Sequence, residues 1–321
     1  MEANKLIFMV YDSRSGSTFL SKLISQQLIN TVVTPEIGFE EILKRSDQTL
    51  NGLKWSKVLR RMVKNDDMRN ADCSFDNLID LYEKQTAKLL PENVFKAVID
   101  QCLKNYKSRF IIIKNGRHIK YINELSRLLG DKAKIIYITR DPRAVISSKL
   151  LTKRPYYPYE VMAWGGALFA AMQWKRYDRY ITVAIKNEAA NILEVSYEDL
   201  ITSQNSVLTK VAAFIGTTIK LKDNIEEQNN YRIPEKEKEI HRLASSNAVS
   251  ARVNAWQQEI TSYQVKQIES ILSKIISQKG YQLRHSDSSP GRLLVILFSF
   301  PELVFKTTRH YFLRFKYSLF N

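Results

Sequence analysis

One short loop in the sequence combines the residue types that bind phosphate, Tyr11-Asp-Ser-Arg-Ser-Gly-Ser-Thr18. It joins an apolar run, Lys5–Tyr11, to a segment with helical periodicity, Thr18–Leu28. The loop therefore precedes a helix N-terminus, where unpaired N–H groups and the positive end of the helix dipole favour an anion. Gly16 has no Cβ, so the backbone can approach that anion closely.

The side chains of the loop suit the same ligand. Arg14 supplies a fixed positive charge, and hydroxyl donors come from Ser15, Ser17 and Thr18. The loop is not of the Walker A type, because Ser17 stands where that motif has its lysine. We predict a phosphate-binding loop of another type, and the alternative is a serine-capped turn without a ligand.

A second strand-to-helix junction offers a further phosphate site. The segment Ile135-Ile-Tyr-Ile-Thr-Arg-Asp-Pro-Arg-Ala-Val-Ile-Ser-Ser148 runs from an apolar strand through a proline turn into a helix. Arg140 stands at the end of the strand and Ser148 lies inside the helix, so the two side chains are placed to bind one phosphate. Asp141 and Arg143 are expected to pair around the turn in a structural role.

The elements that position these residues indicate an α/β fold. Four apolar runs are predicted to be buried parallel strands, Lys5–Tyr11, Arg109–Lys114, Lys134–Thr139 and Asn191–Val195. Helical periodicity marks the segments Thr18–Leu28, Asn123–Leu129, Val207–Ile215 (with Gly216 as its C-cap) and Ser262–Gln278. Alternating strands and helices predict a mostly parallel sheet, and ligands of such sheets bind at the carboxyl ends of the strands.

The order of these motifs resembles the PAPS-dependent sulfotransferase superfamily, in which PAPS is 3′-phosphoadenosine-5′-phosphosulfate. The similarity is greatest to its carbohydrate and tyrosylprotein branches and to bacterial relatives with RSGS in the loop. Further similar stretches are Ile113-Lys-Asn-Gly-Arg117, Val195-Ser-Tyr-Glu-Asp-Leu200, Phe214-Ile-Gly216 and Ala255-Trp256. The resemblance implies a P-loop-like three-layer fold with a central, mostly parallel sheet flanked by helices. It also implies sulfuryl transfer from PAPS to a hydroxyl or amine, a reaction that requires no metal.

The resemblance also implies a role for individual residues. Arg14, Ser15, Gly16, Ser17 and Thr18 would hold the 5′-phosphosulfate, and Arg140 with Ser148 would hold the 3′-phosphate. Arg14 would also have a catalytic role, near the bridging oxygen where the charge of the leaving group develops. Lys114 would contact the transferring sulfuryl group, and Tyr197 would lie against adenine. Weaker candidates for phosphate contact are Ser245, Ser246 and Arg252.

Two residues are candidates for the general base that accepts the acceptor's proton. In the glycan and tyrosylprotein branches the base is often a glutamate some twenty residues after the loop arginine, and Glu36 stands 22 residues after Arg14. Glu36 lies where the chain is expected to leave the first helix, and Glu40 and Glu41 are close by. The competitor is His118, which follows the second predicted strand two residues later than the catalytic histidine of the cytosolic branch. Glu36 is the expected base, and His118 is the alternative.

The overall charge and the C-terminal segment suggest the kind of partner. With 49 basic and 33 acidic residues, the net charge is +16, which favours polyanions. Residues 292–320 combine apolar and aromatic runs with basic residues around Pro301, which suits the interface of an anionic membrane. The alternative is that this segment packs on the domain or on a second subunit.

We therefore expect a sulfotransferase domain at 1–285 and a basic hydrophobic tail at 286–321. The expected acceptor is a carbohydrate or lipid-linked molecule, bound by the segments Asn51–Leu90, Pro155–Trp164 and Tyr231–His241, and no nucleic acid is expected. Without a signal peptide or cysteine ligand spacing, the chain is predicted to be cytoplasmic, at the inner face of a membrane if the tail binds lipid. The alternative functions are a nucleoside or nucleotide kinase and a non-catalytic polyanion-binding protein.

Overall fold

A computed structural model describes residues 5–130, 133–154, 157–220, 250–285 and 289–320 of the chain. The chain forms two compact units, and neither is a continuous stretch of sequence. The first unit comprises Met1–Asp12, Gly16–Thr139 and Tyr180–Glu235. The second comprises Ser13–Ser15, Arg140–Arg179 and Lys236–Asn321.

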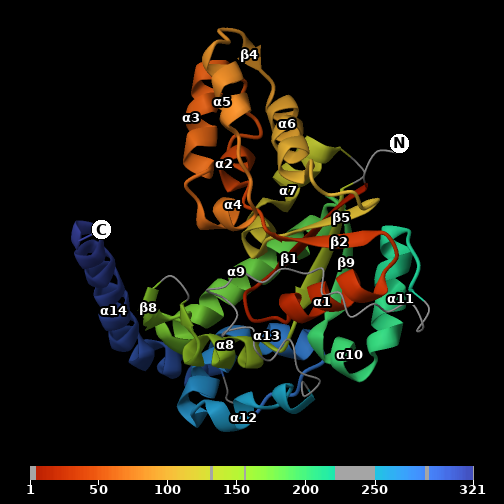
Figure 1. The fold of residues 1–321 in the computed structure, drawn as a ribbon. Coiled ribbons are helices and arrows are strands. Elements are labelled where there is room, and N and C mark those ends of the chain that lie inside the picture. The colour runs from red at the N-terminus through yellow and green to blue at the C-terminus, as the bar shows by residue number, and fades with distance from the viewer. Residues whose placement is uncertain (1–4, 131–132, 155–156, 221–249, 286–288, 321) are drawn as a thin grey trace. The chain divides into compact units, whose positions relative to one another are not determined.

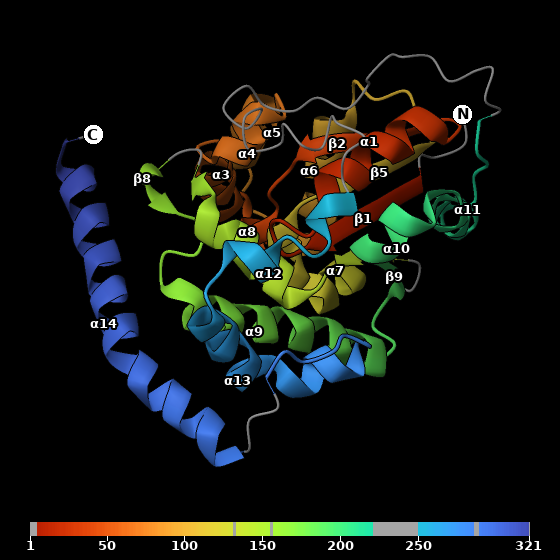
Figure 2. The same cartoon turned by 90° about the horizontal axis from the view of Figure 1, so that it is seen from below.

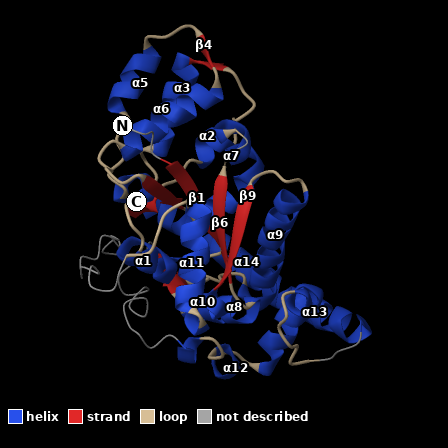
Figure 3. Ribbon diagram, turned by 90° about the vertical axis from the view of Figure 1, so that its right-hand side faces the viewer, coloured by secondary structure: helices blue, strands red, loops and turns tan. Residues whose placement is uncertain are grey.

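The first unit is built on a five-stranded parallel sheet with the strand order β2-β5-β1-β6-β9. Its strands are β1 (Lys5–Tyr11), β2 (Thr31–Glu36), β5 (Phe110–Lys114), β6 (Lys134–Thr139) and β9 (Asn191–Ser196). Figure 3 shows β1, β6 and β9 in red with helices around them. The predicted α/β class and its four strands are confirmed. The edge strand β2 was not predicted. Glu36 is the last residue of this strand, whereas the sequence placed it where the chain leaves the first helix.

Apolar side chains on both faces of the strands explain why the sheet is buried. On one face, Ile7, Met9 and Ile112 belong to a core with α1 (Ser17–Gln27) and α11 (Gln204–Ile215). On the other face, Phe8 of β1 and Ile111 of β5 are fully buried as well. Such two-sided burial is what a continuous apolar run predicts for a central parallel strand. As expected, Gly216 ends α11 in the left-handed conformation, with φ 92°.

The part of the chain that connects β2 to β5 is mostly helical (Figure 1). Its elements are α2 (Glu40–Leu43), β3 (Leu50–Asn51), α3 (Gly52–Met62), α4 (Asp66–Asn70), α5 (Asp76–Glu83), β4 (Lys88–Leu89) and α6 (Pro91–Leu103). The Asn51 side chain caps α3 by accepting from the Lys54 N–H, and Trp55 is fully buried. After β5 the chain forms the 3₁₀ helix η1 (Gly116–Tyr121) and α7 (Ile122–Leu129), and α10 (Tyr197–Thr202) follows β9.

The second unit is mainly helical. Its elements are α8 (Pro142–Leu151), β7 (Lys153–Arg154), β8 (Tyr157–Val161), most of α9 (Gly166–Lys186), η5 (Ser250–Arg252), α12 (Trp256–Glu259), α13 (Ser262–Gln278) and α14 (Ser289–Phe320). Val145, Trp174, Trp256 and Ile268 are among its buried core residues. A capping box at Thr261 and Gln264 fixes the start of α13.

A buried ion network joins three parts of the second unit. Arg143 donates to Asp141 at 2.8 Å and 3.1 Å and to Glu269 at 2.8 Å, and all three side chains are nearly inaccessible to solvent. The Glu269 carboxylate also accepts from the backbone N–H groups of Arg284 and His285. Arg143 therefore has the structural role expected from the sequence, although its link to Glu269 was not predicted.

The C-terminal segment forms the single helix α14, which continues through Pro301 and packs beside α13 (Figure 2). None of the helices in the described part of the chain is both long and apolar enough to cross a membrane.

Candidate functional site

The glycine loop ends at the N-terminus of α1, as the sequence predicted. Gly16 is the N-cap in the left-handed conformation, with φ 93°, and the next two residues, Ser17 and Thr18, are buried. The ring of Tyr197 packs directly on this glycine, because a Cβ built at position 16 would lie 2.3 Å from Tyr197 Cδ2. Both the backbone conformation and the lack of space therefore require glycine here.

A polar cluster occupies the carboxyl ends of β1, β2 and β5 in the first unit. The last residues of these strands are Tyr11, Glu36 and Lys114. The Lys114 Nζ lies 3.3 Å from Thr18 Oγ1, 3.9 Å from Glu36 Oε1 and 5.5 Å from the centre of the Tyr11 ring. The Tyr11 hydroxyl donates to Glu36 Oε1. A cation, a carboxylate and a helix N-terminus thus meet where parallel sheets bind ligands.

Burial differs sharply between the two charged groups of this cluster. The Lys114 side chain is 3% exposed, whereas the Glu36 side chain is 36% exposed. The ammonium group is therefore fixed in place, and the carboxylate is accessible to a molecule from solvent. This combination suits a site in which one group stabilises negative charge and the other accepts a proton.

A second group of donors lies in the second unit, around the start of α8. Arg14 Nε donates to Ser148 Oγ at 2.9 Å. Arg140 donates to two backbone carbonyls, that of Arg14 at 3.2 Å and that of Arg252 at 2.6 Å. The junction that holds Arg140 and Ser148 is thus in contact with two distant parts of the sequence, at Arg14 and Arg252. The contact of Arg14 with Ser148 was not expected, because the resemblance assigned these residues to different ends of the donor.

An acidic residue that the sequence reasoning missed belongs to the same group. Glu259 forms an ion pair with Arg252 and accepts from Ser147 Oγ at 2.7 Å. Burial opposes the ionisation of Glu259, but the hydrogen bonds from Arg252 and Ser147 outweigh it and lower its pKa. The carboxylate therefore stays charged and holds Arg252 in place. Its only sequence signal is a position in the helical turn after Trp256.

His118 lies in the interior of the first unit, away from solvent. It is fully buried, its Nε2 accepts from the Phe39 N–H at 3.1 Å, and its ring stacks on that of Phe39. Burial, aided by the nearby charge of Arg117, lowers the pKa of His118 from 6.5 to about 3. The geometry of the two candidate bases therefore favours Glu36, because its carboxylate is the exposed one.

Some of the remaining site residues predicted from the sequence lie in the described part of the chain, and others lie outside it. Ser15 is buried in the second unit. Ser245, Ser246 and the expected acceptor segment Tyr231–His241 lie outside the described residues. Tyr11 was not predicted as a site residue. The one indication in the sequence is its position as the last residue of the strand before the loop.

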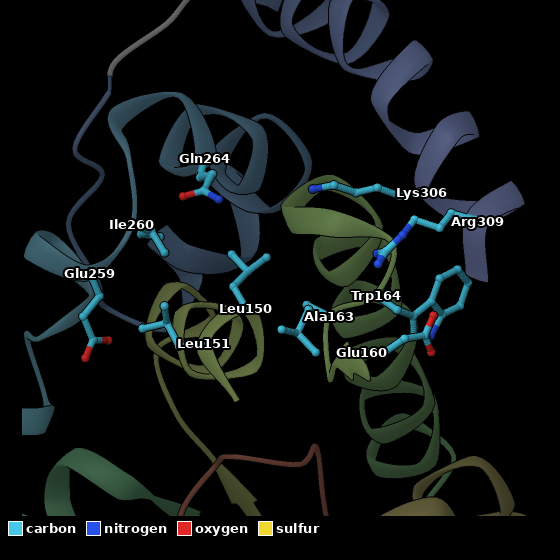
Figure 4. A pocket seen from close by; sticks show the side chains of 11 residues that line it. Leu150, Leu151, Glu160, Ala163, Trp164, Glu259, Ile260, Gln264, Lys306 and Arg309 are labelled. Atoms are coloured by element: carbon cyan, nitrogen blue, oxygen red, sulfur yellow. The ribbon is translucent and has the colours of Figure 1, made fainter. Parts of the chain in front are cut away.

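A cavity of about 340 Å³ lies in the second unit among α8, α12, α13 and α14 (Figure 4). Leu150, Leu151 and Ile260 give it apolar walls, and charged groups come from Glu259, Lys306 and Arg309. Because Glu259 also binds Arg252, this cavity adjoins the arginine group just described. A cavity of this mixed character suits a ligand with polar and apolar parts.

The five-stranded parallel sheet and the glycine loop at a helix N-terminus define a P-loop-like α/β fold. Comparison with known proteins specifies the family. The sequence model described as "Sulfotransferase family" matches residues 7–221, which is more than half of the chain. The chain therefore belongs to the sulfotransferase family, as the sequence motifs indicated.

Solved structures of bacterial sulfotransferases have the same fold. The sulfotransferase domain from the curacin biosynthetic pathway is 18% identical, with a TM-score of 0.53, over 88% of this chain and 100% of that domain. The sulfotransferase domain from the Synechococcus PCC 7002 olefin synthase is 19% identical, with a TM-score of 0.51, over 84% of this chain and 95% of that domain. No curated protein matches the sequence. At these identities, the two structures support the fold alone.

The contact between Gly16 and Tyr197 leads to a prediction about stability. We expect Gly16→Ala to lower the free energy of unfolding by about 2 kcal/mol more than Gly216→Ala does. Both glycines have φ near +92°, but no atom lies within 4 Å of a Cβ built at position 216. The two changes therefore share the backbone strain and differ in the clash. Urea unfolding of both variants measures the difference, and equal unfolding midpoints would contradict the prediction.

The lowered pKa of His118 predicts how its contribution to stability depends on pH. Between pH 6.5 and about 3 the unfolded chain protonates this histidine and the folded chain does not. Its contribution therefore falls as the pH drops through this window. We expect His118→Gln, whose amide oxygen can still accept from the Phe39 N–H, to flatten the pH dependence by about 1.4 kcal/mol per pH unit. Urea unfolding at several pH values tests this, and an unchanged slope would count against it.

Proposed function

We propose that this sulfotransferase uses PAPS as its donor and transfers the sulfuryl group to a hydroxyl or amine of an acceptor. The observation that carries the proposal is the cluster of Lys114, Glu36 and the α1 N-terminus at the carboxyl ends of three parallel strands. Membership of the family supports sulfuryl transfer. The donor and the roles of the residues are inferred from the chemistry of the site.

Each unit by itself supplies groups that suit a phosphate of the proposed donor. At one end, Gly16 offers a backbone without a Cβ at a helix N-terminus, beside the Lys114 ammonium group. For the other end, the second unit supplies Arg140 and Ser148, with Arg14 and Arg252 in contact with them. Fixed guanidinium groups are the usual partners of phosphate oxygens. The first group is assigned to the 5′-phosphosulfate and the second to the 3′-phosphate.

When bound, PAPS supplies an activated sulfuryl group on a phosphate leaving group. Glu36 accepts the proton that the acceptor hydroxyl releases as its oxygen bonds to sulfur. Lys114 stabilises the negative charge that develops as the sulfur–oxygen bond to the phosphate breaks. Because the Tyr11 hydroxyl donates to Oε1 of Glu36, it holds the carboxyl group in one orientation and leaves Oε2 for the acceptor. Glu36 is thus the proposed general base.

The proposed acceptor is a carbohydrate or a lipid-linked molecule. The mixed cavity of the second unit supports this choice, because its leucine walls and charged groups suit an amphiphilic ligand. Trp164 lines the same cavity and belongs to the segment Pro155–Trp164, which was expected to bind the acceptor. Its ring lies against that of His310 at 4.0 Å, so packing accounts for part of its role.

Binding of the product 3′-phosphoadenosine-5′-phosphate tests the donor site. We expect binding without Mg²⁺, weakened about a hundredfold by Arg140→Ala because a buried, fixed charge is lost. The matched control is Arg61→Ala, which removes an exposed arginine of α3. Calorimetric titration measures both, with ATP and Mg²⁺ as the competing ligand. A preference for ATP with Mg²⁺ would instead indicate a kinase, and polyanion binding alone would indicate a non-catalytic protein.

Replacement of the proposed base separates binding from chemistry. We expect Glu36→Gln to keep the affinity for 3′-phosphoadenosine-5′-phosphate and to lower kcat by about 10²–10⁴-fold, the usual range for loss of a general base. Release of this nucleotide from PAPS, with a panel of aryl, sugar and glycolipid hydroxyls, provides the measurement. Glu41→Gln is the matched control, because Glu41 of α2 forms ion pairs with Lys44 and Arg45 and is not part of the Lys114 cluster. Wild-type turnover of Glu36→Gln would rule out the assignment.

A further inference from the structure

Helix α14 presents a broad apolar surface to solvent. Phe298 is 75% exposed and Phe305 is 68% exposed. Of the exposed large apolar residues in the described part of the chain, more than half belong to this one helix. They are Leu293, Leu294, Leu297, Phe298, Phe300, Val304, Phe305, Tyr311, Phe312 and Phe315. Exposed apolar surface of this extent marks an interaction site in a folded protein.

The polar side of α14 faces its own unit, which is the reverse of an ordinary surface helix. Ser299 is 1% exposed, and its hydroxyl accepts from Gln267 Nε2 at 2.9 Å. His310 is 3% exposed, and its Nδ1 lies 2.8 Å from the Glu160 carboxylate. Because these contacts fix the rotation of the helix, its apolar side is held outward. The exposed surface is therefore a consequence of specific polar contacts.

The spacing of the exposed residues confirms that they share one side. At 3.6 residues per turn, Leu293, Leu297, Phe300, Val304 and Phe315 fall within a quarter of the helix circumference. Phe298, Phe305 and Phe312 follow each other at seven-residue intervals along the adjoining strip. The apolar side is thus continuous along the helix and rich in aromatic rings.

Basic residues border this apolar side. On the helical projection, Arg309 and Lys316 lie at one edge of the apolar side and Arg314 lies at the other, and all three are exposed. The one acidic residue of α14 in the described part of the chain, Glu302, is paired with Lys306 at 2.5 Å. The surface around the apolar strip is therefore positively charged, on a chain whose net charge is +16.

We propose that α14 docks on an anionic phospholipid membrane and lies in the plane of its interface. Phenylalanine and leucine side chains would enter the acyl boundary, and the flanking arginine and lysine groups would contact lipid phosphates. The charge selects this occupant over a second copy of the chain, because two α14 helices packed together would oppose like charges. The inward polar side keeps the helix attached to its unit while it is docked.

The proposal is tested with the purified full chain and sedimenting vesicles. We expect binding to phosphatidylcholine vesicles that contain phosphatidylglycerol, weak binding to phosphatidylcholine alone, and a decrease with added salt. Phe298→Ser/Phe305→Ser/Phe312→Ser should lower the partition coefficient by about tenfold or more, since three apolar rings are lost. The matched control, Ile29→Ser/Val183→Ser/Ile185→Ser, removes exposed apolar residues of the first unit that lie outside the expected acceptor segments, and it should bind as wild type does.

Two further measurements complete the test. Arg314→Glu/Lys316→Glu should reduce binding to the anionic vesicles and make the remaining binding less dependent on salt. Binding of 3′-phosphoadenosine-5′-phosphate by every variant shows that its fold and donor site are intact. Absence of vesicle binding, or equal binding by the triple phenylalanine variant, overturns the proposal. A dimer in analytical ultracentrifugation that the triple variant abolishes, without vesicle binding, would assign the surface to a second copy instead.

Discussion

The buried ammonium group of Lys114 imposes the strictest requirement on the site. A charge removed from water is costly unless partners replace its hydration, and Lys114 is 3% exposed. Its partners come from three directions: the Thr18 hydroxyl on α1, the Glu36 carboxylate on β2 and the Tyr11 ring on β1. Strand pairing enforces this arrangement, because Lys114 is opposite Met9 on β1 and Glu36 on β2. Glu36, Lys114 and Tyr11 are thus arranged in the order of their strands, β2, β5 and β1.

Part of this arrangement was predictable from local sequence. Continuous apolar runs predicted β1, β5, β6 and β9, and the glycine before Ser17 predicted the loop at the helix N-terminus. The edge strand β2 was missed because Thr31-Val-Val-Thr-Pro-Glu36 is short, half polar and contains Pro35, which argues against a strand. The bulge in its pairing with β5 between Val33 and Glu36 is the structural counterpart of that proline. Glu36 was therefore expected after the first helix, whereas it is the last residue of β2.

Contacts between distant segments were beyond local sequence patterns. Nothing near Arg140 indicates that it binds the carbonyl of Arg252, and nothing near Arg14 indicates Ser148 as its partner. The C-terminal segment shows the same limit. Its composition left membrane binding and packing as alternatives, yet α14 packs with one side and exposes the other. Contacts such as those of Ser299 and His310 determine which side of the helix packs and which side is exposed.

The interleaving of the two units has a consequence for the order in which the protein forms during synthesis. The loop residues Ser13–Ser15 group with Arg140–Arg179 and with segments after residue 236, although the residues on either side of them belong to the first unit. Arg140 cannot bind the Arg252 carbonyl until the ribosome has released that distant segment. The five-stranded sheet is complete by Ser196. The scaffold can thus fold co-translationally, while the arginine group forms only after Arg252 has been synthesised.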